Sequence, residues 1–412
     1  MRVIADLHLH SKYSRATSPR CDLDGLSEWA RIKGISLLGT GDFTHPKWLR
    51  EIKEGLKPAG EGAFSHNGVN FLLSAEVSNV FEAGGRTKKI HTLLLAPSFE
   101  AVGQLNDILK RYGNLAEDGR PTLLMDVAEL LDVCKEVSRE IFFAPAHSWT
   151  PWFGIFGSKS GFNSLEEAFG KKATYVKALE TGLSSDPEMN WMVSRLDSIS
   201  LISNSDAHSP EKIGREANVF ELEEIAYKSV IEAITTRKGF IKTYEFYPEE
   251  GKYHWDGHRN CGVCLDPKDA KKLGGRCPKC GKPVTIGVLH RVMDLGDRPL
   301  GYVPERSVPF TRLVPLETII SAVRGRGEQA KEVREEYLRL VGYFGNEFAV
   351  LEAPKEQLRL AADKLLADAI VNAREGRICW RPGYDGNFGE LLLDRKSAPP
   401  SFFHGQKRLA DF

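Results

Sequence analysis

The chain has 412 residues, of which 42% are hydrophobic, and equal numbers of basic and acidic side chains, 56 of each. This length and composition predict a globular protein of two or three domains. Because the overall charge is balanced, any basic surface for nucleic acid must be local. No apolar stretch approaches the roughly 20 residues that cross a bilayer, and no signal peptide precedes the first strand pattern. We therefore expect a cytoplasmic protein with no membrane partner.

Residues 1–240 alternate between short apolar runs and amphipathic runs. The runs typical of strands are 3–5, 36–38, 71–73, 90–95, 141–144, 175–179 and 199–202. The runs typical of helices are 26–33, 48–56, 102–112, 125–137 and 191–196. Such alternation predicts parallel strands joined by helices, with the active site at the C-terminal strand ends.

Histidines and carboxylates follow the expected strands. His8 and His10 come first, and their spacing puts both side chains on one face of a strand, where they can hold one metal ion. Alone, this pair would more often be a chance occurrence. Later strands add Asp42, His45, Glu76, His147, Glu180, Asp206 and His208 after their ends, and His91 within the fourth strand. Because these ends meet at one edge of the fold, the pattern predicts a metal site.

Together these motifs, His8-x-His10, Thr40-Gly41-Asp42, Glu76, His91, His147 and Asp206-x-His208, resemble the successive motifs of the polymerase and histidinol phosphatase (PHP) superfamily. The resemblance implies an α/β fold, a distorted seven-stranded β/α barrel, with two or three divalent metals (Zn²⁺, Mg²⁺ or Mn²⁺). The implied ligands are His8, His10, Glu76 and Asp206 for the first metal, Glu76, His91 and His147 for the second, and Asp42 and His208 for the third. The expected catalytic residues among them are His8, Glu76 and Asp206.

Metals bridged by one carboxylate can orient a phosphate, activate water and stabilise the leaving oxygen. Phosphoester hydrolysis is therefore the expected reaction. One departure concerns the third metal: Arg15 and Ala16 stand where many members of the superfamily have an acid or a histidine. That site is expected to be weaker, or to be completed by His45 or by the substrate. Arg15 is a candidate phosphate contact because its guanidinium is a planar fork, and a surface arginine without a role is the alternative.

Two loops near the expected metals are candidates for substrate recognition. Trp149, Trp152 and Phe153 follow His147 directly and could stack an unpaired base or open a duplex. Packing of these rings under the rim is an equal alternative. Asp186, in a Ser-Asp-Pro sequence, is a candidate general base, but a helix N-cap is the favoured interpretation.

Residues 241–299 contain two Cys-x-x-Cys pairs, Cys261 with Cys264 and Cys277 with Cys280. Four thiolates at this spacing predict one structural Zn²⁺, and a redox dithiol is disfavoured because it would not need two pairs. Lys271 and Lys272 belong to a basic stretch around these cysteines. They are candidate contacts to a DNA backbone, and a solvated lysine face is the alternative.

Residues 300–395 show two helical patterns, 316–343 and 355–374, which predict a small helical DNA-binding domain. Residues 396–412 are the expected tail. Its end resembles the peptide that docks on the sliding clamp PCNA, although the usual second aromatic residue is absent. The residues of this peptide are Gln406, Leu409 and Phe412.

The order of barrel, four-cysteine module, basic helical domain and clamp peptide resembles the endonuclease Q family of DNA repair enzymes. The resemblance implies a nucleoid-associated, metal-dependent endonuclease that cuts DNA 5′ to deaminated bases (uracil, hypoxanthine or xanthine) or abasic sites. Two other classes stay open: a phosphoesterase acting on small phosphate monoesters, and a non-catalytic DNA adaptor bound to the clamp. The near-complete set of metal ligands disfavours the adaptor.

Overall fold

A mixed β-sheet organises the first two thirds of the chain in the computed structural model, which describes residues 1–392. Within that range its eleven strands follow the order β15-β12-β11-β1-β2-β5-β4-β3, with β6, β7 and β8 joined through β5 and β6. The strands are β1 (Arg2–Asp6), β2 (Leu37–Gly39), β3 (Lys57–Gly60), β4 (Ala63–His66), β5 (Val69–Ala83), β6 (Arg86–Ala96), β7 (Thr122–Leu123), β8 (Phe142–Pro145), β11 (Ala217–Glu221), β12 (Phe240–Phe246) and β15 (Phe310–Leu313). A separate parallel pair is formed by β9 (Ala178–Glu180) and β10 (Ser200–Ile202).

Each of the seven expected strands overlaps a strand of the structure, but the pairing is not uniformly parallel and the sheet is larger than expected. β1, β2 and β5 pair in parallel, whereas β6 is antiparallel to both β5 and β8. The cause is a two-residue turn at Gly84 and Gly85, both with positive φ, which folds β5 back onto β6 without a helix. The expected strand at 175–179 starts only at Ala178, because Gly170–Tyr175 form a 3-10 helix, η1.

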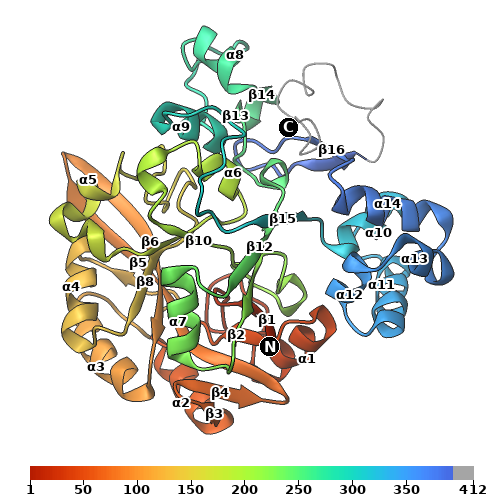
Figure 1. Cartoon of the computed structure of the whole chain (residues 1–412). Coiled ribbons are helices and arrows are strands. Elements are labelled where there is room, and N and C mark those ends of the chain that lie inside the picture. Colours follow the sequence, from red (N-terminus) through yellow and green to blue (C-terminus); the bar gives the residue numbers. More distant parts are fainter. Residues whose placement is uncertain (393–412) are drawn as a thin grey trace.

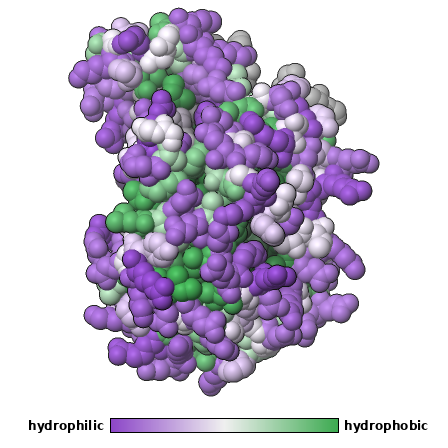
Figure 2. All heavy atoms as spheres, turned by 90° about the vertical axis from the view of Figure 1, so that its left-hand side faces the viewer, coloured by the Kyte–Doolittle hydropathy of each residue, from purple (hydrophilic) through white to green (hydrophobic). Residues whose placement is uncertain are grey.

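Seven helices cover the sheet, with α3 and α4 on the left of Figure 1. They are α1 (Leu23–Lys33), α2 (Pro46–Gly55), α3 (Phe99–Leu109), α4 (Val127–Val137), α5 (Leu165–Phe169), α6 (Pro187–Asn190) and α7 (Tyr227–Thr236). The expected helix at 191–196 is instead a short 3-10 turn, η2 (Ser194–Leu196). Hydrophilic residues cover most of the face in Figure 2, and hydrophobic residues appear there only in smaller patches.

The cysteine-containing region lies at the top of Figure 1 and the blue helices lie on the right. The first contains β13 (Asp256–His258), β14 (Val263–Leu265), α8 (Pro267–Lys272) and α9 (Val288–Leu295). The second contains α10 (Leu316–Arg324), α11 (Lys331–Phe344), α12 (Glu347–Glu352), α13 (Lys355–Ala361) and α14 (Lys364–Arg374), followed by β16 (Cys379–Arg381) and β17 (Glu390–Leu392). Each predicted long helix is split in two. Gly325, with φ of 61°, ends α10, and Asp363 caps the start of α14.

These regions are joined to the sheet. β15 belongs to the third predicted domain, residues 300–395, yet it pairs in parallel with β12, which begins where the first predicted domain ends. Lys33 of α1 and Glu347 of α12 form a buried ion pair of 2.5 Å. Among the described residues, none of the helices combines the length and apolar character needed to cross a bilayer. The expected clamp peptide lies outside the described residues.

Candidate metal centre

Glu76, on β5, lies at the middle of a buried cluster. Its Oε2 is 3.5 Å from His8 Nε2 and 3.2 Å from His10 Nε2. Its Oε1 is 2.7 Å from His91 Nδ1 and 3.1 Å from His147 Nε2. One carboxylate thus faces two groups of potential ligands that could each hold a metal: His8, His10, Glu76 and Asp206, and Glu76, His91 and His147. These are the two sets that the PHP resemblance implies.

Backbone contacts bring the first and last of these side chains together. Leu9 and Ala207 form a parallel β-bridge, and the Asp206 N–H donates to His8 O at 2.9 Å. Asp206 and His147 have positive φ, 48° and 30°. Non-glycine residues rarely adopt this conformation, and such strained positions cluster at functional sites.

A second layer of side chains orients the histidines. His8 Nδ1 lies 3.0 Å from both carboxylate oxygens of Glu180, and His147 Nδ1 lies 2.9 Å from Thr150 Oγ1. Each contact holds one ring nitrogen, so the other faces the cluster, as in metal-binding histidines. His8 Nε2 is buried and has no hydrogen-bond partner within residues 1–392. A buried nitrogen left free in this way fits a metal ion.

The charges of the cluster also fit a cation. Burial disfavours the charged form of His8, but Glu180 and Glu76 outweigh it and hold the pKa of His8 well above its ordinary value. Burial would raise the pKa of Asp206, but the hydrogen bond from His10 and the charge of His8 lower it. Burial lowers the pKa of His91 to about 4, so this imidazole is neutral near pH 7 and its nitrogen is available as a ligand.

Asp42 and His208, the expected ligands of a third metal, belong to neither group. Asp42 Oδ1 lies 3.0 Å from His10 Nδ1, while its Oδ2 accepts hydrogen bonds from Ser11 N, Ser11 Oγ and Ser14 Oγ. A Cβ on Gly119 would lie 2.2 Å from Oδ2, so backbone packs directly over this carboxylate. Asp42 therefore orients His10.

His208 turns its Nδ1 to the backbone oxygen of Asp206, 2.9 Å away, and its ring lies 4.4 Å from that of His10. His45, considered as a replacement ligand, caps helix α2, with Nδ1 3.4 Å from the N–H of Trp48. Among the described residues, the expected third metal position therefore has no group of three ligands.

Asp186 is a helix cap, as the favoured interpretation predicts. Its Oδ1 accepts the N–H of Met189 at 3.0 Å at the start of α6. Its Oδ2 accepts two hydrogen bonds from Arg312, 2.9 Å and 2.5 Å long. Both oxygens of this buried carboxylate therefore accept hydrogen bonds from the protein itself, which disfavours the general-base alternative.

The three rings of the aromatic loop differ in whether they support base stacking or packing under the rim. Trp149 is buried, and its Nε1 donates to Asn190 Oδ1 at 2.8 Å, which favours the packing alternative for this ring. Trp152 is 38% exposed and packs edge-on against Tyr253. Phe153 has a φ of 69°, and its ring lies 4.3 Å from that of His91. Trp152 and Phe153 therefore stay candidates for DNA contact.

The basic candidates lie on the surface, and each has an acidic neighbour. Arg15 is 71% exposed and pairs with Glu117 at 2.8 Å. Lys271 pairs with Asp294 at 2.7 Å, and Lys272 pairs with Asp269 at 2.9 Å. Exposed pairs of this kind contribute little energy, so they leave the predicted phosphate contacts open.

Sequence reasoning missed Arg120. Its Nη1 donates to Glu76 Oε2 at 3.0 Å from the loop that follows α3. This loop can approach because Gly119 packs against Asp42 without a side chain. No strand end precedes Arg120, so the pattern that indicated the other residues could not find it. Glu180 was visible as a strand-end carboxylate, but no sequence pattern indicated that it pairs with His8.

The cysteine group differs from the expected four thiolates. The ligand atoms that come together belong to His258, Cys261, Cys277 and Cys280. Cys264 lies on β14 between Val263 and Leu265, whose side chains pack with Cys277. Because side chains alternate along a strand, Cys264 points to the opposite side, where its Sγ lies 3.9 Å from Pro382 O. His258 takes its place.

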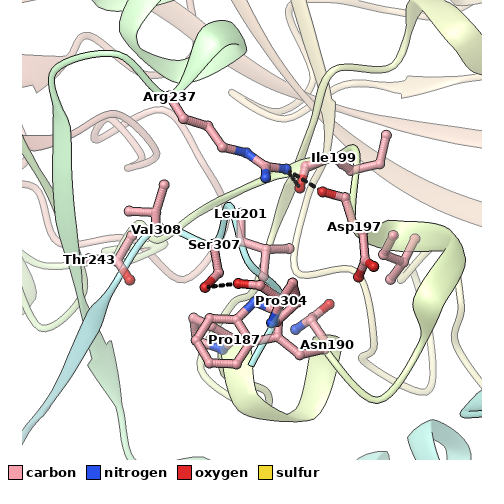
Figure 3. A pocket seen from close by; sticks show the side chains of 12 residues that line it. Pro187, Asn190, Asp197, Ile199, Leu201, Arg237, Thr243, Pro304, Ser307 and Val308 are labelled. Atoms are coloured by element: carbon pink, nitrogen blue, oxygen red, sulfur yellow. Dashed lines mark hydrogen bonds between the residues drawn. The ribbon is translucent and has the colours of Figure 1, made fainter. Parts of the chain in front are cut away.

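A pocket away from the cluster is shown in Figure 3. Arg237 reaches into it and donates to the backbone oxygens of Asp197 and Ile199, at 2.8 Å and 2.7 Å, and its Nε lies 3.2 Å from Ser200 Oγ. Ser200 begins β10, whereas Asp206 follows the other end of that strand. The guanidinium is therefore engaged by the protein itself, and this pocket is structural.

The comparisons agree with this geometry. A family model described as PHP-associated matches residues 195–238, and one described as MJ0043 C-terminal domain matches residues 315–377. Fold and cluster together define a PHP-type protein with metal-capable sites. An uncharacterized protein of Methanocaldococcus jannaschii is 34% identical over 251 residues, 59% of this chain but only 31% of that protein.

Two solved structures resemble the whole chain. The lesion-specific endonuclease PfuEndoQ from Pyrococcus furiosus is 33% identical, with a TM-score of 0.86, and the match covers 99% of this chain and 100% of that one. Endonuclease Q in complex with a 27-mer duplex substrate carrying an abasic lesion is 33% identical, with a TM-score of 0.86 and 100% of both chains covered. The chain belongs to the endonuclease Q family.

Proposed function

We propose that this protein is a DNA repair endonuclease that hydrolyses the phosphodiester on the 5′ side of a deaminated base (uracil, hypoxanthine or xanthine) or an abasic site. The observation that carries the proposal is Glu76, whose two oxygens face two groups of histidines and acids in a chain similar over its whole length to a lesion-specific endonuclease. An endonuclease Q structure with an abasic duplex supports DNA as the substrate.

The two groups would hold two divalent metals that share Glu76. When bound, such metals orient a phosphate, lower the pKa of water and stabilise the leaving oxygen. Among Zn²⁺, Mn²⁺ and Mg²⁺, the four imidazoles favour Zn²⁺. The group of His258 with three cysteines would hold one structural Zn²⁺.

The chain's own side chains would prepare the site for this chemistry. Glu180, Asp42 and Thr150 fix the ring orientations of His8, His10 and His147. Arg120 offsets the negative charge of Glu76. Preorganised groups of this kind lower the reorganisation needed in the transition state.

DNA would contact the rim near Trp152 and Phe153 and the basic surface of the cysteine module around Lys271 and Lys272. Stacking on an exposed ring is the interaction that an unpaired base offers. We also propose that the clamp peptide, which includes Gln406, binds PCNA.

The test is an incision assay on duplexes that each carry one uracil, hypoxanthine, xanthine or abasic site, with the cut position mapped against an undamaged duplex. We expect cutting 5′ to each lesion and none in the undamaged DNA. Asp206→Asn should reduce incision by about 1,000-fold or more, because it removes a ligand charge, while DNA binding persists. Asp107→Asn is the matched control, since Asp107 is 75% exposed and pairs only with Lys110.

Unchanged incision by Asp206→Asn would contradict the assignment of the site. Hydrolysis of a small phosphate monoester without any cutting of lesion-containing DNA would support a phosphoesterase instead. Removal of residues 406–412 should leave incision intact and abolish stimulation by the clamp.

A further inference from the structure

Arg215 lies in the loop between the 3-10 helix η3 (Pro210–Lys212) and β11, where it contacts the residue that precedes Asp206. Its Nε donates a hydrogen bond of 2.9 Å to the backbone oxygen of Ser205, the residue before Asp206. The side chain is half-buried. This contact directs the guanidinium to the strand end that carries Asp206.

The guanidinium of Arg215 has no carboxylate partner. Within residues 1–392, no Asp or Glu oxygen lies within 4.0 Å of it, and its two Nη atoms donate no hydrogen bond. Burial lowers the pKa of Arg215 even though Asp206, Glu216 and Glu250 lie in its surroundings. A desolvated cation without a partner is costly, so this position is suited to an anion that comes from outside the chain.

Arg120 provides the contrast within the same site. Its Nη1 is 3.0 Å from Glu76 Oε2, and although burial opposes its charge, Glu76 and Asp206 raise its pKa. Arg120 thus has a protein carboxylate as its partner. Arg215 is the guanidinium beside the cluster that is left with its Nη donors free.

We propose that Arg215 binds the phosphate presented to the metal centre, which is the scissile phosphodiester. The inference rests on the proposed endonuclease function and adds a substrate-binding residue to it. A guanidinium matches two non-bridging phosphate oxygens with two parallel hydrogen bonds. The Ser205 contact holds the side chain by Nε, so both Nη groups can serve this purpose.

The test uses the full-length protein and a duplex with one abasic-site analogue. Binding is measured by fluorescence anisotropy with Asp206→Asn added to every protein that is compared, because this substitution should prevent cutting while the zinc of the cysteine module stays in place. We expect Arg215→Gln to weaken binding about 10-fold, the loss of one charged contact. With a neutral methylphosphonate at the scissile linkage, wild type and Arg215→Gln should bind equally.

Cleavage provides a second readout. Arg215→Gln should lower kcat/KM by about 100-fold, as expected for removal of a donor to a reacting oxygen. Arg215→Lys, which keeps the charge but not the fork, should recover part of the loss and also guards against a folding defect in the glutamine variant. Arg20→Gln is the control: Arg20 is 45% exposed and pairs with Glu211 at 2.6 Å, and its loss should change neither readout.

Three results would overturn the inference. In the first, the binding defect of Arg215→Gln persists with the methylphosphonate at the scissile linkage. In the second, the defect disappears only when a neighbouring linkage is neutralised. In the third, it is the binding defect of Arg120→Gln that disappears with the methylphosphonate at the scissile linkage. A wild-type protein that fails to cut abasic DNA would refute the proposed function itself. Wild-type cutting together with normal binding and cutting by both Arg215 variants would refute only the role of Arg215.

Discussion

The two candidate metal sites differ in how much protein surrounds them. In the Glu76 cluster, His8, His10 and Glu76 are at most 1% exposed, and a second layer of side chains holds the rings. In the cysteine module, Cys280 is exposed, and the described hydrophobic cluster contains only three buried residues, Val263, Cys277 and Val284. The cluster is therefore built by the sheet itself, whereas we expect the module to need a bound metal in order to fold.

Removal of all metals should produce the largest difference between the Glu76 cluster and the cysteine module. We expect a strong chelator to abolish the amide-exchange protection of residues 256–285, because the proposed Zn²⁺ supplies about 10 kcal/mol of folding free energy there. β1, β2 and β5 should stay protected, since their burial does not depend on a metal. Hydrogen exchange read by mass spectrometry checks both regions, with readdition of Zn²⁺ as the control. A module that remains protected without metal would remove the distinction.

Substitution of single candidate ligands in the cysteine module should produce the next largest effect. His258→Ala should eliminate the zinc of the module, because only three thiolates remain. Cys264→Ala should keep the zinc content of the wild type and change the free energy of unfolding by only about 1 kcal/mol, since its Sγ faces Pro382. Elemental analysis of purified variants measures the zinc content. Zinc lost from Cys264→Ala and kept by His258→Ala would restore the four-cysteine prediction.

The second layer of the cluster should show a smaller effect. Glu180→Gln should weaken metal binding at the His8 position by about 10- to 100-fold, because the amide orients the imidazole less well than the carboxylate. Metal titration followed by competition with a chelator gives the affinity. Glu82→Gln, on the exposed end of β5, is the control and should behave as wild type. Equal affinities for all three proteins would show that the second layer is dispensable.

Burial near the cluster should make the free energy of unfolding depend on pH. Burial raises the pKa of Glu245 from 4.5 to about 8. The native state then keeps a proton that the unfolded state releases above about pH 4.5, so the stability from this group falls as pH rises from there to 8. Glu245→Gln should be more stable at pH 7 by about 1–3 kcal/mol and should lose less stability between pH 5 and 8. Urea unfolding measures this, and a pH slope equal to that of wild type would contradict it.

Local chemistry made some features predictable from the sequence. Asp186 was expected to cap a helix because Ser-Asp-Pro has that preference in any context, and α6 begins there. The predicted helix at 316–343 is in fact two helices, α10 and α11, with Gly325 and Gly327 at the break. The break was missed because apolar periodicity continues across a turn when both helices pack on one core. The β5–β6 hairpin was also missed, since its Gly84-Gly85 turn outweighs the general alternation of strands and helices.

By itself, the sequence determined which side chains meet around Glu76. His8, His147 and Asp206 follow the ends of β1, β8 and β10, whereas Glu76 and His91 lie within the longer strands β5 and β6, which extend past them. Only the tertiary structure decided the roles of side chains that depend on loop packing. Asp42 orients His10 because Gly119 covers it, and His258 replaces Cys264 because of the alternation along β14. Arg120 reaches Glu76 from a loop, and Arg215 reaches the backbone of Ser205 from another loop. The physical reason is range: strand ends follow from local pattern, whereas the partner of a loop side chain is set by residues distant in the chain.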